Sequence, residues 1–174
     1  MSRPTAASSG PLLARPLRFL VVFSLLTGPL LYAWAGASTH YLAAIAALAN
    51  AILGATGCPV TLNAPTGASG EVVHPGTVGA LALFAATPGR PWRWMARWAL
   101  VTLAVLVCLH VLLLVAATWQ AWAHAAPAAG ADLYLLPLVS RLVNGSRDWA
   151  PLLAVVVIWF SALRASTPPM DSTA

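Results

Sequence analysis

Three single residues, Cys58, His74 and Arg147, are the parts from which a cysteine nucleophile could be built. The thiol would attack, the imidazole would act as base, and the guanidinium would stabilise the developing negative charge. Cys58 follows an apolar stretch, where its thiol can meet water, and His74 closes the segment that Cys58 opens. No motif surrounds any of the three. The favoured interpretation is therefore a small residue beside Pro59 at a helix exit, and the catalytic one is the alternative.

Two polar residues, His110 and Asn50, stand inside apolar stretches. An ionisable side chain at bilayer depth is a candidate functional group by default. No second histidine or acid accompanies His110 there to complete a proton relay. We therefore favour a neutral imidazole bonded to a serine, a threonine or a backbone carbonyl of a neighbouring helix. Cys108 is two residues from His110, on a different helix face, and is expected to be a buried, inert thiol.

No metal or cofactor is expected. Cys58, His40, His74 and His124 include no close pair of ligands of the kind that a zinc site needs. The chain has no glycine-rich loop that would hold a phosphate. Its two cysteines allow at most one disulfide and exclude a multi-cysteine cluster.

The composition points to a membrane protein. The 174 residues are 60% hydrophobic and 7% charged, with nine arginines, no lysine and four acids. This excludes a disordered chain, an ordinary soluble enzyme and a small disulfide-stapled domain. The net charge of +5 does not indicate nucleic-acid binding, because the arginines flank apolar stretches instead of clustering on one soluble face. The lipid bilayer is the expected partner, together with another membrane protein.

Five apolar segments predict an all-α integral membrane protein, since a crossing takes about 20 apolar residues. The expected spans cover residues 17–35, 41–57, 75–87, 97–118 and 149–164 of a single domain over 17–165. Residues 1–16 and 166–174 are expected to be disordered cytoplasmic tails. Five spans would place the two termini on opposite sides, so the side of the C-terminus stays open. A cleaved signal peptide ending near Ala33 to Ala35 is an alternative for the first span.

Arginine placement orients the chain. The positive-inside rule puts the arginine-rich side and the N-terminus in the cytoplasm, as expected for a bacterial inner-membrane protein. Arg141 and Arg147 are expected on the outer side. The cytoplasmic set comprises Arg3, Arg15, Arg18, Arg90, Arg93, Arg97 and Arg164.

Two segments are expected outside the membrane. Residues 58–74 contain two short β-leaning runs around a Pro/Gly/Ser turn, which predicts a small extracytoplasmic β-hairpin. Residues 119–148 form a longer loop, and its apolar part, 133–143, is expected to lie along the interface.

The order of these parts resembles the short members of the exosortase/archaeosortase family, membrane transpeptidases that process C-terminal sorting signals. The likeness covers residues 17–118. It starts at Arg18-Phe19-Leu20 and continues through the helix 41–57, the β-like stretch 60–73, the short segment 78–84 and the turn 90–93. The family places its catalytic Cys, Arg and His where this chain has 74–77, 116–118 and 147–149. None of the three residues is present at these positions, so the resemblance implies a diverged, non-catalytic member.

These observations predict an accessory or scaffold subunit in a membrane-associated sorting or export process. The alternative is a cysteine transpeptidase or protease that uses Cys58 with His74 and Arg147. A small transporter component is a second alternative, disfavoured because the spans hold almost no polar lining beyond Asn50 and His110.

Overall fold

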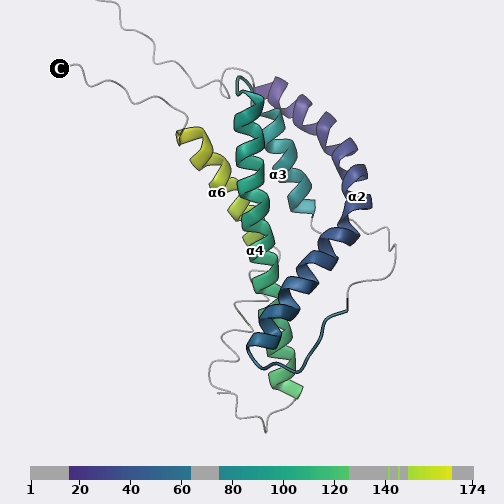
Figure 1. The fold of residues 1–174 in the computed structure, drawn as a ribbon. Helices are drawn as coiled ribbons and strands as arrows, with labels where there is room; N and C mark the ends of the chain where they lie inside the picture. The colour runs from purple at the N-terminus through teal and green to yellow at the C-terminus, as the bar shows by residue number, and fades with distance from the viewer. Residues whose placement is uncertain (1–15, 64–74, 126–140, 142–144, 146–148, 166–174) are drawn as a thin grey trace, which may run out of the picture.

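The computed structural model describes residues 16–63, 75–125, 141, 145 and 149–165, and four helices make up most of this part of the chain (Figure 1). They are α2 (Pro16–Ala55), α3 (Pro75–Ala86), α4 (Trp92–Ala125) and α6 (Ala150–Ala165). The predicted all-α class is confirmed for these residues. Two helices, α2 and α4, are long and apolar enough to cross a bilayer.

α2 is one continuous helix of 40 residues, which corrects the prediction of separate spans over 17–35 and 41–57. The residues between those spans, 36–40, include no proline, and the Ser38 hydroxyl donates to the Ala35 carbonyl oxygen at 2.9 Å. Pro29 lies inside α2, where it removes one backbone donor without ending the helix. Figure 1 shows that α2 is bowed along its length. At about 1.5 Å per residue α2 extends roughly 60 Å, enough for one crossing of a hydrocarbon layer about 30 Å thick.

Because residues 16–55 form one helix and not two, the helices that follow run in other directions than the predicted spans. In Figure 1 α2 and α4 run in one direction, and α3 and α6 run in the other. The start of α2 and the end of α6 therefore lie at the same end of the molecule, and that end carries five arginines. The described residues therefore do not support the predicted five spans or the predicted placement of the two ends on opposite sides. The arginines at this shared end lie in or next to α2, α4 and α6. The five are Arg18, Arg90, Arg93, Arg97 and Arg164.

The short helices α3 and α6 lie side by side and begin deep in the molecule. At about 1.5 Å per residue they extend roughly 18 and 24 Å from the arginine-bearing end, less than the hydrocarbon thickness. A Cβ on Gly76 of α3 would lie 3.5 Å from Leu152 of α6. Near their other ends, Trp159 Nε1 donates to Thr87 Oγ1 at 3.0 Å. These two contacts set α3 and α6 parallel.

No β-strand occurs in the described part of the 58–74 segment, residues 58–63, so the predicted β-hairpin is not supported. The reason is that the backbone of Leu62 pairs with a side chain of α2 instead of a partner strand. Residues 64–74, and most of the predicted loop 119–148 after Ala125, lie outside the described residues.

The described helices expose many large apolar side chains, and small residues make up much of what they bury. Large apolar side chains face outward on α2, α4 and α6, among them Leu17 (74% exposed) and Tyr32 (87% exposed). The buried positions are dominated by alanines and hydroxyl-bearing residues, because small side chains let helices approach closely. The buried polar residues are Ser38, Thr77, Thr87, Thr102, His110 and Thr118.

The close approach of α2 and α4 depends on Ala49, which is fully buried beside Ile45 and Val111. We expect Ala49→Leu to lower the free energy of unfolding by about 1–3 kcal/mol, because a larger side chain at this contact forces the helices apart. Ala47→Leu, on the exposed face of the same helix, is the matched control and should change little. Thermal unfolding in detergent compares them, and equal midpoints would refute this packing.

Candidate functional site

The most distinctive polar contact joins α2 to α4. Tyr41 Oη and His110 Nδ1 lie 2.6 Å apart in a hydrogen bond, and the two rings meet edge to face with centroids 5.9 Å apart. Trp34 packs on the other side of Tyr41 at 5.0 Å between centroids. His110 is 6% exposed. The bond fixes the ring of His110 and determines which nitrogen faces α2.

A third helix reaches the same point. Thr77, in the first turn of α3, is 2% exposed, and its hydroxyl lies beside the Tyr41 phenol without reaching hydrogen-bond geometry. We call Tyr41, Thr77 and His110 the polar cluster. It brings together α2, α3 and α4 at the depth where α3 begins. The described residues contain no Asp or Glu, so within them the cluster has no carboxylate to form a proton relay. What the cluster does in the described residues is join α2 to α4 through the bond between Tyr41 and His110.

Sequence reasoning found His110 but not its partner. The expected bond to a neighbouring helix exists, yet the acceptor or donor is a tyrosine instead of a serine, a threonine or a carbonyl. Tyr41 was missed because it stands at the start of a predicted span, where an interfacial role is the usual one. Cys108, expected to be buried, is exposed on the outer face of α4.

Asn50, the other intramembrane polar candidate, anchors the chain that follows α2. Its Nδ2 donates to the Leu62 carbonyl oxygen at 2.9 Å, and the Leu62 N–H donates to its Oδ1 at 2.8 Å. One side-chain amide thus satisfies both backbone groups of Leu62, as a neighbouring strand would. Leu62 in turn packs against the cluster of Ile45, Ala49 and Val111. Asn50 therefore holds residues 58–62 back against the helices.

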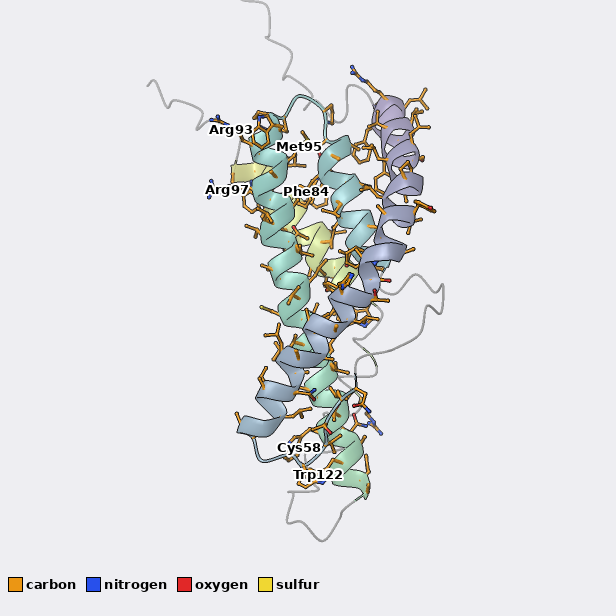
Figure 2. All side chains as sticks on the ribbon, turned by 45° about the vertical axis from the view of Figure 1, so that its right-hand side comes forward. Cys58, Phe84, Arg93, Met95, Arg97 and Trp122 are labelled. Atoms are coloured by element: carbon orange, nitrogen blue, oxygen red, sulfur yellow. The ribbon has the colours of Figure 1, made fainter. Side chains whose placement is uncertain are left out.

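Cys58 occupies a helix cap. The Cys58 N–H donates to the Leu53 carbonyl oxygen at 3.0 Å, and the N–H of Gly57 (φ 74°) donates to the Gly54 carbonyl at 3.2 Å. This pair of bonds is the Schellman motif, which ends α2 and favours glycine at the left-handed position. The Cys58 side chain is 6% exposed, and Figure 2 shows it near Trp122, at the end opposite Arg93 and Arg97. The thiol is thus shielded from water at a position that the cap explains.

The catalytic roles considered for the partners of Cys58 stay predictions. His74 and Arg147 lie outside the described residues, so the structure does not place them relative to Cys58. His40 and His124 are both exposed, near the middle of α2 and in the last turn of α4. The described residues include no group of three potential metal ligands.

Comparison of the chain with protein-family models, curated proteins and solved structures gave no match. The resemblance to exosortases therefore rests on the order of the segments alone.

The Tyr41–His110 bond should be measurable as a coupling between α2 and α4. Tyr41→Phe removes the phenol oxygen and should lower the free energy of unfolding by about 1 kcal/mol, typical of a hydrogen bond between membrane helices. Tyr32→Phe, on the exposed face of the same helix, should have no effect. In a double-mutant cycle, Tyr41→Phe should cost less in a His110→Leu background. Additive effects would show that the two side chains do not interact.

Proposed function

We propose that the chain is an integral protein of the bacterial inner membrane that crosses it four times, with the arginine-bearing end in the cytoplasm. The large apolar side chains exposed on α2, α4 and α6 support this, because they suit a lipid environment and not water. The five arginines at one end support the orientation.

The hydroxyl groups support the same environment. In lipid every polar group needs a partner within the protein. Thr102 Oγ1 donates to the Trp98 carbonyl, and Ser161, exposed on α6, donates to the Val157 carbonyl, each at 2.8 Å. Such bonds to the carbonyl four residues earlier satisfy a hydroxyl without water. The same bond is made by Thr27, Thr87 and Thr118.

We further propose that its role is that of a non-catalytic accessory or scaffold subunit in a sorting or export process of the membrane. The observation that carries this proposal is the placement of Cys58, the one candidate nucleophile near an aqueous face, in a buried helix cap. A nucleophile has to reach its substrate and titrate in water. The polar cluster joins helices to one another, and the two hydrogen bonds of Asn50 hold the chain after α2 against them. Such contacts are what a rigid support requires.

A surface for a partner helix lies on the outer face of α2. Ala43 and Ala47 are both exposed there, four residues apart. Small residues at this spacing allow another membrane helix to approach closely. Inside the chain α2 already uses Ala46 and Ala49 in this way.

Native electrophoresis of the tagged full-length chain, extracted from its own membrane in mild detergent, tests this role. We expect the 18.1-kDa chain to migrate in a larger assembly with a second protein. Ala47→Leu should release it, because the bulkier side chain blocks the helix contact, whereas Cys58→Ser should leave the assembly and the export process intact. Loss of the process in Cys58→Ser, with the assembly preserved, would contradict the scaffold role and favour the transpeptidase.

A further inference from the structure

The first turns of α4 carry an exposed pair of arginines. Arg93 and Arg97 are four residues apart, both are exposed, and Figure 2 shows both extending to the same outer side of the molecule. We call this pair the arginine ridge. Residues four apart on a helix are neighbours on its surface, so the two guanidinium groups can contact one ligand together.

The ridge lacks a compensating negative charge in the described chain. The described residues contain no acid, and the first turn of α4 has none. A helix N-terminus has a partial positive charge, which the guanidinium of Arg93 adds to and does not offset. An anion bound at the ridge would lower the electrostatic energy of the helix N-terminus and of the guanidinium groups.

The geometry of the guanidinium groups suits an oxyanion. The Cζ of Arg93 lies 5.9 Å from the ring centroid of Trp92, and that of Arg97 lies 6.0 Å from the centroid of Trp98. Each guanidinium carries several N–H donors in its plane. Those donors match the spacing of phosphate oxygens.

The surface that continues from the ridge selects the kind of anion. One turn further along α4, Leu100 is 67% exposed and Val101 is 40% exposed, and Val105 and Leu112 follow at 39% and 61%. A free phosphate would make no favourable contact with this apolar strip. A phospholipid has both a phosphate and acyl chains long enough to cover it.

We propose that the arginine ridge binds the headgroup phosphate of an anionic phospholipid, whose acyl chains lie along the exposed apolar strip of α4. This inference rests on the proposed membrane location and adds a specific lipid site to it. The bound lipid would cover the exposed side of α4 at the cytoplasmic end of the helix bundle.

The test measures binding of phosphatidylglycerol and of phosphatidylcholine to the purified full-length protein by native mass spectrometry from detergent. The wild type should retain phosphatidylglycerol preferentially, and more weakly at high salt. The double variant Arg93→Gln/Arg97→Gln should bind it about 30-fold more weakly, as expected when two basic side chains near a bilayer surface are lost. Arg18→Gln, an exposed arginine on α2 at the same end, should bind like the wild type.

Three outcomes would overturn the lipid site. They are equal retention of the two lipids by the wild type, undiminished binding by the double variant, and an equal loss in Arg18→Gln, which would indicate nonspecific charge attraction. The unfolding midpoint without added lipid confirms that each variant is folded. Membrane fractionation separates the two proposals: a chain washed off by carbonate would refute the membrane location, whereas an integral chain without lipid preference would refute only this site.

Discussion

The contacts between the described helices depend on one constraint: polar side chains enclosed between helices are stable there when they form hydrogen bonds across the contact. Tyr41 and His110 meet this constraint jointly, because each would otherwise leave a polar atom without water at the contact between α2 and α4. The bond holds the C-terminal half of α2 against α4. The first turn of α3 lies beside this contact. Trp159 and Thr87 meet the same constraint between α6 and α3. One side-chain hydrogen bond thus joins α2 to α4, and the other joins α6 to the end of α3.

The continuity of α2 determines how charge is arranged. Because α2 runs without a break from Pro16 to Ala55, the short α3 brings the chain back to the end where α2 started. Arg18 near the start of α2, the three arginines around the start of α4 and Arg164 near the end of α6 then share one end. These five arginines lie at one end of the fold only when α2 is a single helix.

Sequence reasoning identified the apolar segments and the polar residues inside them, because hydropathy and composition are local properties. It divided α2 at residues 36–40, since a hydropathy count treats small and polar residues as a boundary even where their hydroxyls bond to their own helix. It could not find Tyr41 as the partner of His110, because the pairing depends on how the helices cross. For Cys58 it favoured a small residue at a helix exit, and the bonds of Gly57 and Cys58 to α2 show a helix cap at that place. The alternative of a nucleophile stays a prediction. The sequence signal for that cap was present in the glycine before the cysteine.

The most direct test of the proposed four crossings concerns the two ends of the chain, because an even number of crossings places both ends on the same side. Green fluorescent protein and alkaline phosphatase, fused in turn to each end of the full-length chain, report the side on which that end lies. The account predicts fluorescence and no phosphatase activity at both ends. Fluorescence at one end with phosphatase activity at the other would show an odd number of crossings and contradict the proposed four.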